Sequence, residues 1–411
     1  MEERNILDIL TERGLIKQAS HLEETRKLLE NEKVTFYIGF DPTADSLHVG
    51  HYVALMTMAH MQRAGHRPIA LLGGGTAMIG DPSGKSDMRK MLTQEDIDHN
   101  ASCFRKQMER LVSFEGENAA IMVNNGDWIR GLNFLDFMRE IGTEFSVNRM
   151  LAAECYKLRM ETGLTFFEMS YMLMQSYDFL MLNRKYNCVL EMGGDDQWSN
   201  MLGGVDLIRK KERKPAYCLT TGLLTNSEGK KMGKTEKGAV WLDPDKCPVY
   251  DFYQYWRNVP DSDVKKCMSM LTFIPMEEVD ALCAEGGAAL NHAKEVLAFT
   301  LTEQVHGTEE ANKAQAAASA LFSGVGDIAS MPTVALTAED IAATKLRYTE
   351  LLVMGKLCKS KGDARRMIES GAVFCGDEKI TDVFGCADEA SLDEGFILKK
   401  GKKGFVRVVR A

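Results

Sequence analysis

The sequence predicts an α/β fold in which a doubly wound parallel sheet is followed by an α-helical region and a small α+β domain. Three observations predict it. Short apolar runs end in glycine or small polar residues, segments of helical length separate these runs, and the pattern beyond about Pro248 is helical. The runs that we expect to be buried strands are 34–40, 69–75, 119–125 and 188–194.

The segments between these strands indicate the kind of sheet. Residues 48–64 and 165–183 have helical length and mixed apolar spacing. Strands that alternate with helices form parallel sheets with helices on both faces, which is the Rossmann-like arrangement. Ligands of such sheets bind at the carboxyl ends of the strands, so we expect the functional residues there.

The rest of the chain is expected to be helical and then compact again. Helices are expected over 249–257, 261–271, 276–283 and 290–321. A low-charge stretch with glycine and proline follows, which is typical of a linker. These changes indicate a sheet domain, a lysine-rich loop with a helical domain, a linker and a C-terminal domain. The expected bounds are 1–225, 226–323, 324–340 and 341–411.

Length and composition fit a multidomain protein. The chain has 411 residues, more than one domain usually contains. It begins with acids instead of the basic start of a signal peptide, and no apolar run approaches the roughly 20 residues of a membrane span. The ten cysteines form no C-x-x-C pair or zinc-site pattern. We therefore expect a cytoplasmic protein with reduced thiols, no membrane partner and no bound structural metal.

The net charge of −9, taken alone, argues against a nucleic-acid partner. The distribution of charge matters more, because residues 345–411 contain 14 basic and 10 acidic residues while the remainder is acidic. Six cations without an acid among them end the chain, either as a solvated strand edge or as a phosphate-binding patch. They are Lys399, Lys400, Lys402, Lys403, Arg407 and Arg410.

The first candidate site follows the strand at 34–40. After a short loop, Ser46 is expected to cap a helix whose first turn contains His48 and His51. A helix N-terminus favours an anion, Gly50 lets a phosphate approach, and both histidines can donate hydrogen bonds from one face. The alternatives are two histidines on an ordinary helix or a zinc pair, and the latter lacks a nearby third ligand.

The second candidate site is the glycine-rich segment 73–86. It is one residue short of a P-loop, and its three glycines do not complete G-x-G-x-x-G. What remains is a strand-end loop that permits close backbone approach, followed by Asp81 and two cations, Lys85 and Arg89, about one helical turn apart. The alternative is a flexible loop with surface charges.

The third candidate is a polar stripe on an otherwise apolar helix. Tyr171, Gln175 and Asp178 have the spacing i, i+4, i+7 and so share one face. This face is either exposed to solvent or turned toward a polar pocket inside the protein, since buried glutamine and aspartate need partners.

Two further segments carry polar groups on glycine-rich loops. After the strand at 188–194, Asp196 and Gln197 offer groups for a ribose and a polar substrate, unless the glycines only form a turn. Residues 230–235 place three lysines on a mobile loop, which suits transient stabilisation of a polyphosphate or is an ordinary solvated surface.

Together, in this order and spacing, these segments resemble the class I aminoacyl-tRNA synthetases, and in detail the bacterial tyrosyl-tRNA synthetases. Residues 48–51 look like the first signature of that family and residues 231–235 like the second. Residues 351–382 resemble the S4-type RNA-binding module that ends these enzymes. The resemblance covers nearly the whole chain.

The resemblance implies an activity and partners. The enzyme would activate L-tyrosine with ATP, release pyrophosphate with the help of Mg²⁺, and transfer tyrosine to the 3′-terminal ribose of tRNA(Tyr). It would form a homodimer through an interface around residues 127–156. Catalysis would rest on positioning and electrostatics without a protein nucleophile.

The resemblance also implies roles for individual residues. The tyrosine-binding residues would be Tyr37 and Asp178 at the phenol, Asp81, Tyr171 and Gln175 at the ammonium group, and Gln197 at the carboxyl region. ATP would contact Gly39, Asp41, His48, Gly50, His51, Gly194, Asp196, Lys231 and Lys234, of which Asp41 also lies near the ammonium group. The catalytic residues at the leaving pyrophosphate would be Thr43, His48, His51, Lys85, Arg89, Lys231, Lys234 and Thr235.

Some positions depart from the family pattern, and other functions compete. Ile38 replaces a frequent cysteine, Ala54 a threonine of some relatives, and Asp195 a common serine, which adds negative charge beside the adenylate site. The tryptophan enzyme shares the fold, but the pairing of Tyr37 with Asp178 favours tyrosine. An inactive RNA-binding relative would not need the signatures, and a small adenylyltransferase would not need the later domains.

Overall fold

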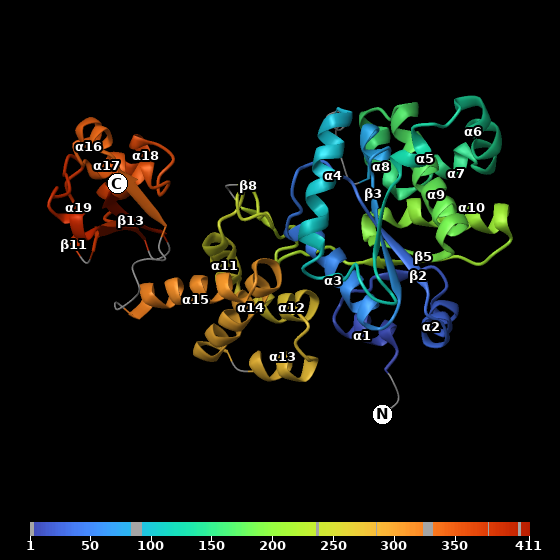
Figure 1. The fold of residues 1–411 in the computed structure, drawn as a ribbon, viewed down its shortest axis with the longest axis horizontal. Helices are drawn as coiled ribbons and strands as arrows, with labels where there is room; N and C mark the ends of the chain where they lie inside the picture. The colour runs from blue at the N-terminus through green and yellow to red at the C-terminus, as the bar shows by residue number, and fades with distance from the viewer. Residues whose placement is uncertain are drawn as a thin grey trace. The chain divides into compact units, whose positions relative to one another are not determined.

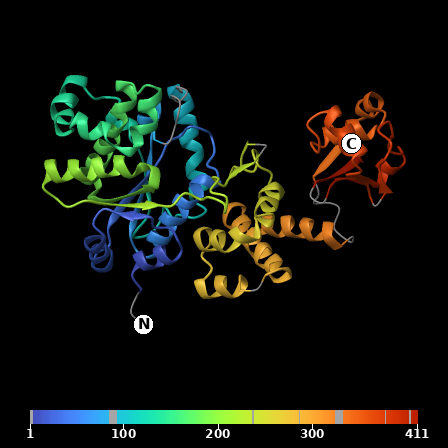
Figure 2. The same ribbon diagram turned by 180° about the vertical axis from the view of Figure 1, so that it is seen from behind.

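The computed structural model describes residues 4–83, 93–235, 238–284, 286–323, 332–376, 378–401 and 404–411. The chain forms two compact units, Met1–Ala311 and Asn312–Ala411. Figures 1 and 2 show the ribbon from two opposite sides. Among the described residues, no helix has the length and apolar character needed to span a bilayer.

The described part of the first unit is built on a six-stranded sheet with the order β1-β6-β5-β2-β3-β4. Its strands are β1 (Gln18–Ala19), β2 (Thr35–Phe40), β3 (Arg67–Leu72), β4 (Ile121–Asn124), β5 (Cys188–Gly194) and β6 (Tyr217–Thr221). All neighbours pair in parallel except β1, which is antiparallel to β6. The predicted parallel α/β sheet is confirmed, with β2 to β5 at the four apolar runs. The pattern predicts neither β1 nor β6.

Helices cover both faces of this sheet. Figure 1 shows α3 (Val49–Arg63) and α4 (Gln94–Met108) on one side, and α9 (Phe166–Tyr186) and α10 (Trp198–Glu212) on the other. α9 ends where Asn187 adopts φ 52°, a left-handed conformation that stops a helix. Two shorter helices, α1 (Ile6–Glu12) and α2 (Leu22–Asn31), precede β2.

A helical insertion lies between β4 and α9, where we expect the dimer interface. Its elements are α5 (Gly126–Ile129), α6 (Phe134–Glu140), the 3₁₀ helix η2 (Gly142–Glu144), α7 (Val147–Leu151) and α8 (Glu154–Thr162). α8 is fixed to the start of α9 by the buried Tyr156, whose hydroxyl donates to the carbonyl of Met169 at 2.8 Å. The insertion is therefore attached to the helix that carries the polar stripe.

After β6 the chain forms a small hairpin and then a helical region. The hairpin consists of β7 (Lys234–Thr235) and β8 (Gly238–Ala239). The helices are α11 (Val249–Arg257), α12 (Asp261–Leu271), α13 (Met276–Leu282), α14 (Ala288–His306) and α15 (Thr308–Ser323). The expected helices are present, but the alanine-rich stretch is two helices, because the chain breaks at Gly307 with φ +93°.

Among its described residues, the second unit contains a five-stranded sheet with the order β11-β10-β12-β13-β9. The strands are β9 (Thr333–Leu336), β10 (Val373–Cys375), β11 (Glu378–Lys379), β12 (Phe396–Lys400) and β13 (Gly404–Arg410). The helices are α16 (Ala338–Thr344), α17 (Tyr348–Met354), α18 (Lys361–Glu369) and α19 (Ser391–Glu394). The small α+β domain is confirmed. β9 falls in the expected linker 324–340, and the other domain bounds stay predictions.

Candidate active site

A cavity of about 350 Å³ opens at the carboxyl ends of the parallel strands. It lies where β2 and β5 are neighbours, because the connections from these two strands run to opposite sides of the sheet and leave room for a ligand. The structure brings most of the expected binding residues together there. They are Tyr37, Gly39, Asp41, His48, Gly50, His51, Asp81, Tyr171, Gln175, Asp178, Gly194, Asp196, Gln197 and Lys231.

The remaining expected residues are not placed at this cavity. Thr43 lies exposed on the loop after β2. Lys85 and Arg89 fall outside the described residues. Lys234 and Thr235 form β7, but their side chains are likewise outside the described part.

The two signature histidines cap the helix that they begin. The Nδ1 of His48 accepts from the backbone N–H of Gly50 at 2.9 Å, and the Nδ1 of His51 accepts from the backbone N–H of His48 at 3.2 Å. The expectation that Ser46 is the cap is wrong, because its buried hydroxyl donates to the carbonyl of Leu47. Glycine is required at Gly50, since a Cβ would lie 2.7 Å from the His48 ring.

The capping bonds determine where these imidazoles carry their protons. Because both Nδ1 atoms accept, each neutral ring has its proton on Nε2. Burial, and to a lesser extent His48, lower the pKa of His51 to about 3, so the His51 ring is neutral at physiological pH. The two rings stack with centroids 4.0 Å apart. The pair therefore offers Nε2–H donors that suit phosphate oxygens.

Tyr37 and Asp178 are buried polar groups of the cavity wall, each 2% exposed. The Nδ2 of Asn125 donates to one carboxyl oxygen of Asp178 at 2.8 Å, and the Nε1 of Trp128 donates to the other at 2.7 Å. Burial raises the pKa of Asp178 to about 8, although these two hydrogen bonds oppose the shift. The sequence pattern missed Asn125 and Trp128 as functional residues.

The hydroxyl of Tyr37 is buried without a hydrogen-bond partner in the part of the chain that is described. Burial, followed by the neighbouring Glu191, raises its pKa. A buried hydroxyl without a partner destabilises a protein by about 1–3 kcal/mol. A polar ligand group beside Tyr37 would supply the missing bond.

Two hydrogen-bonded carboxylates line another part of the wall. Asp81 accepts from the Nε2 of Gln197 at 2.8 Å and from the backbone N–H of Ser83 at 2.9 Å. Asp41 accepts from the hydroxyls of Tyr171 and Thr76, both at 3.3 Å. These bonds hold the acids in place, and their negative charge suits a cationic group.

The glycine-rich loop after β3 makes room for side chains of the protein itself. A Cβ at Gly73 would lie 2.1 Å from Oδ1 of Asp41, and one at Gly74 would lie 2.1 Å from Oδ1 of Asn124. We expected the glycines of this loop to let a ligand approach the backbone closely. The groups that approach these glycines are instead side chains at the ends of the neighbouring strands, an acid and an amide. These groups belong to the cavity wall or support it.

The end of β5 forms a further side of the cavity. A Cβ at Gly194 would lie 2.6 Å from Asp196, whose pKa is raised mainly by burial. Asp195 does not line the cavity, because it accepts from Gln18 at 2.6 Å and from Thr220 at 2.9 Å. The charge that we expected beside the adenylate site is thus hydrogen-bonded toward β1 and β6. Ile38 and Ala54, the other departures, line the cavity.

The lysine loop is attached to the N-terminus of α3. The N–H of Val49 donates to the carbonyl of Val240 at 2.9 Å. Gly233 has φ +82°, and a Cβ there would lie 2.8 Å from the Cβ of Val49. The N–H of Gly233 also donates to the hydroxyl of Tyr255 in α11 at 2.8 Å. The two signatures are therefore in direct contact through Gly233 and Val49.

The lysines of this loop differ in position. Lys231 lines the cavity, and it opposes the rise in the pKa of Asp196. Lys230 does not line it, and its ammonium group pairs with Glu228 at 2.8 Å on the exposed surface. Only Lys231 of these two is placed to meet a ligand.

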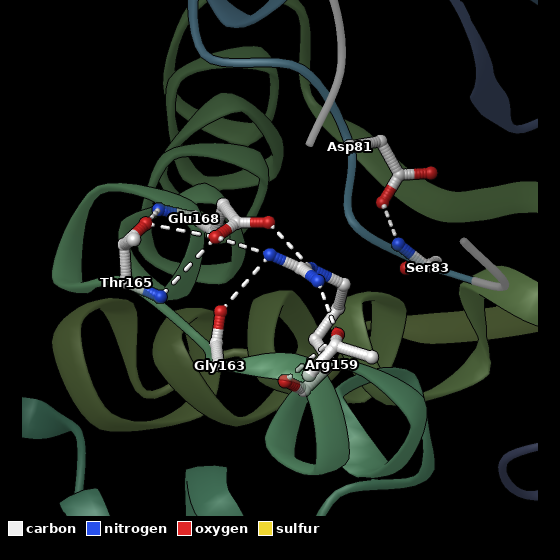
Figure 3. A network of polar contacts seen from close by, with 7 residues as sticks. Asp81, Ser83, Arg159, Gly163, Thr165 and Glu168 are labelled. Atoms are coloured by element: carbon white, nitrogen blue, oxygen red, sulfur yellow. Dashed lines mark hydrogen bonds and ion pairs between the residues drawn. The ribbon is translucent and has the colours of Figure 1, made fainter. Parts of the chain in front are cut away.

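Figure 3 shows the network that fixes the start of α9, drawn with the Asp81–Ser83 hydrogen bond. The guanidinium of Arg159 and the carboxylate of Glu168 are buried and pair at 2.7 Å. Glu168 also accepts from the backbone N–H and the hydroxyl of Thr165, which forms a capping box. The polar stripe of α9 is thereby held in register with the cavity.

Within the described ranges, no group of three or more His, Cys, Asp or Glu side chains is arranged to hold a metal ion. The alternative of a zinc pair therefore finds no third ligand there. The histidine pair instead lies at a strand-end cavity, on a helix joined to a lysine loop. Together with the Rossmann-like sheet, this arrangement defines the class I aminoacyl-tRNA synthetases.

Comparison with known proteins agrees. Residues 29–323 match the family model described as tRNA synthetases class I (W and Y), and residues 327–408 match the tyrosine–tRNA ligase SYY-like C-terminal domain. The chain is 58% identical to the tyrosine–tRNA ligase of Clostridium botulinum over 407 residues, which is 98% of this chain and 99% of that protein. The chain belongs to the tyrosine–tRNA ligases.

Solved structures show the same fold. A C-terminally truncated mitochondrial tyrosyl-tRNA synthetase from Aspergillus nidulans has a TM-score of 0.70 at 28% identity, over 78% of this chain and 95% of that one. A tryptophanyl-tRNA synthetase from Encephalitozoon cuniculi has a TM-score of 0.54 at 13% identity, over 75% and 86%. The similarity to the tryptophanyl-tRNA synthetase shows a shared fold and nothing about the substrate.

Proposed function

We propose that this cavity performs the tyrosine–tRNA ligase reaction in two steps. L-Tyrosine reacts with ATP to give tyrosyl-adenylate and pyrophosphate, and the tyrosyl group then passes to the 3′-terminal ribose of tRNA(Tyr). The observation that carries the assignment is the presence of Tyr37 and Asp178 in one buried wall, because both can hydrogen-bond a phenol. Action in the cytoplasm, where tRNA is charged, is part of this proposal.

The rest of the amino acid meets the other polar groups of the wall. Asp81, Tyr171 and Gln175 would receive the ammonium group, and Gln197 would lie at the carboxyl region. The excess of acids along the wall favours a cation there. Asp41 supports this end, because it is held by the hydroxyl of Tyr171.

In the first step, a carboxylate oxygen of tyrosine attacks the α-phosphorus of ATP, and the bond to the bridging oxygen of pyrophosphate breaks. Negative charge then develops on the leaving group. We assign its stabilisation to the Nε2–H groups of His48 and His51 and to Lys231. Gly39, Gly50, Gly194 and Asp196 would contact the nucleotide. The resemblance alone supports the same role for Thr43, Lys85, Arg89, Lys234 and Thr235.

Mg²⁺ would reach this site bound to the phosphates of ATP. The described residues offer no cage of three or more ligands, and Mg²⁺ in such enzymes needs only one or two carboxylates besides phosphate and water. Asp41 and Asp196 line the cavity, and the resemblance assigns both to the nucleotide, so they would fit this need. The ion would neutralise charge on the leaving pyrophosphate.

A homodimer would cover exposed apolar side chains of the insertion. Phe134, Leu135 and Val147 are 64%, 74% and 53% exposed, and side chains of this kind on a surface favour association. Leu135→Glu should shift the mass measured by sedimentation from dimer toward monomer. Leu22→Glu is the matched control, because Leu22 is 49% exposed on α2, outside the insertion. Equal masses for both variants would contradict the interface.

The C-terminal unit would bind tRNA. Two of the six terminal cations serve the unit itself, since Lys400 donates to the carbonyl of Leu357 and Arg410 pairs with Asp393. Arg365 and Arg366 are exposed on α18, where phosphates could reach them, and Arg366 also lies 3.8 Å from Asp363. Replacing both by glutamate should weaken tRNA charging while tyrosine-dependent pyrophosphate exchange is kept. Loss of exchange would contradict this division of roles.

The phosphate assignment has a direct test. Lys231→Ala should slow adenylate formation about 100-fold, because a cation at the developing charge is lost, with little change in the Kd of tyrosine. Lys230→Ala is the control and should keep the wild-type rate. A large rise in the tyrosine Kd at an unchanged rate would show that Lys231 belongs to the amino-acid end.

A further inference from the structure

Glu191 is a buried acid of the cavity wall to which neither signature nor resemblance gives a role. It lies in β5, directly beside Tyr37 of β2 in the sheet register, and it is 2% exposed. A Cβ at position 204 would lie 3.3 Å from its Oε2 and 2.9 Å from Phe179, so Gly204 provides the space for this carboxyl. A buried carboxyl in a fitted space calls for an explanation.

The carboxyl of Glu191 makes one hydrogen bond to the polar stripe. Its Oε1 accepts from the Nε2 of Gln175 at 3.0 Å. In the described part of the chain, neither Oε2 of Glu191 nor Oε1 of Gln175 has a partner with hydrogen-bond geometry, and both atoms are buried. The Tyr37 hydroxyl lies near enough to Glu191 to oppose the rise in its pKa. The two oxygens of this pair that lack a partner are both hydrogen-bond acceptors.

A side-chain amide has two nearly equal ends, and its partners decide which end points where. An ionised carboxylate only accepts hydrogen bonds. Beside the ionised form of Glu191, Gln175 turns Nε2 toward β5, which leaves Oε1 as the free end. An amide oxygen can accept from an ammonium group, whereas an amide nitrogen would repel it.

We propose that Glu191 is a positioning residue for the amino-acid substrate, which orients Gln175 so that its Oε1 accepts from the substrate's ammonium group. The inference rests on the proposed assignment of Gln175 to that group. The charge balance of the wall supports it. Among the described residues, five carboxyl groups including that of Glu191 line the cavity, against the single lysine Lys231. A bound ammonium group would supply the countercharge.

The test compares two substitutions at one position. Glu191→Leu removes the acceptor with little change of volume, and the KM of tyrosine in pyrophosphate exchange should rise about tenfold. The KM of ATP and the kcat should stay within about twofold, because the phosphate end is untouched. Glu191→Gln keeps an acceptor oxygen but allows the pair to turn over, so its KM should rise only about threefold. An unchanged KM in both variants would overturn the proposal.

A ligand without the ammonium group separates this role from an action on Tyr37. The inhibition constant of 3-(4-hydroxyphenyl)propionate should change less than about twofold in Glu191→Leu, because that ligand does not use Gln175. An equal loss of affinity for tyrosine and for this analogue would show that Glu191 acts on the binding of the phenol group, and would overturn the proposal. Thermal unfolding of each variant shows whether it is folded. If Glu191→Leu does not fold, the test rests on Glu191→Gln alone.

A double-mutant cycle distinguishes the inference from the assignment on which it rests. In Gln175→Ala, substitution of Glu191 by leucine should raise the tyrosine KM no further, since Glu191 acts through Gln175. A large effect of Gln175→Ala with fully additive effects in the double variant would overturn the inference alone. No effect of Gln175→Ala on tyrosine would overturn the assignment of Gln175 itself.

Discussion

The side chain of His51 accepts a hydrogen bond from the backbone N–H of His48 at 3.2 Å, and this bond closes the capping box of α3. The two histidines thus have a structural role at Nδ1 and a chemical role at Nε2. Each Nδ1 accepts from a backbone N–H, so each neutral ring carries its proton on Nε2.

The two roles of His51 can be separated. His51→Ala should lower the free energy of unfolding by about 1 kcal/mol through the lost cap, and should also slow adenylate formation. His51→Gln should recover the stability, because glutamine suits the third position of a capping box, but not the rate. Denaturant unfolding and single-turnover kinetics measure the two quantities. Full recovery of the rate in His51→Gln would mean that His51 is only a cap.

Gly233 should be irreplaceable because of its contact with Val49. Gly233→Ala combines a left-handed φ of +82° with a Cβ 2.8 Å from Val49, so we expect the lysine loop to shift and pyrophosphate exchange to fall at least tenfold. Gly238→Ala is the matched control, since φ is +116° but a Cβ there would meet no atom of the described residues within 4 Å. A similar loss of exchange in both variants would attribute the effect to backbone strain alone.

Tyrosine binding should depend on pH through Glu191. Burial raises the pKa of this carboxyl to about 7, with Tyr37, Asp178, Cys188 and Cys218 as the titratable groups around it. A bound ammonium group favours the ionised acid, so tyrosine affinity should increase as the pH rises from about 6 to about 8, with release of protons. Calorimetry in buffers of different ionisation enthalpy measures the release, which Glu191→Gln should reduce.

The same shift has a consequence for the stability of the empty protein. The folded pKa of Glu191 lies above its ordinary value of 4.5, so the folded state holds a proton that the unfolded state has lost. The stabilisation of the folded state by this bound proton is complete below about pH 4.5 and is lost as the pH rises through about 7. The free energy of unfolding of Glu191→Gln should therefore change less with pH over this range than that of the wild type. Identical pH profiles for the two proteins would contradict this prediction.

The buried pair of Arg159 and Glu168 should be among the most sensitive positions outside the cavity. Arg159→Met leaves Glu168 buried without its cation and should lower the free energy of unfolding by about 3–5 kcal/mol. Arg159 also lowers the pKa of Glu168, so the stabilisation is present at neutral pH and is lost as the pH falls. Arg184→Met is the control, because its pair with Glu212 is partly exposed and should contribute no more than about 1 kcal/mol.

The sequence predicts much of the fold and cavity because strands β2 to β5 are apolar and their ends are rich in glycine. It does not predict β6, because only the first three of residues 217–221 are apolar and this run is too short to be distinguished. Asn125 and Trp128 were not recognisable, because they lie 53 and 50 residues from Asp178 and meet it only in the folded sheet. The capping role of His48 likewise depends on side-chain geometry.

Amino-acid-dependent exchange between ATP and pyrophosphate tests the central claim most directly. The purified protein, supplied in turn with tyrosine, phenylalanine and tryptophan, should exchange strongly with tyrosine alone, and Tyr37→Phe should reduce its preference for tyrosine over phenylalanine. Exchange that depends on tryptophan but not on tyrosine, or no exchange with any of the three, would contradict the account.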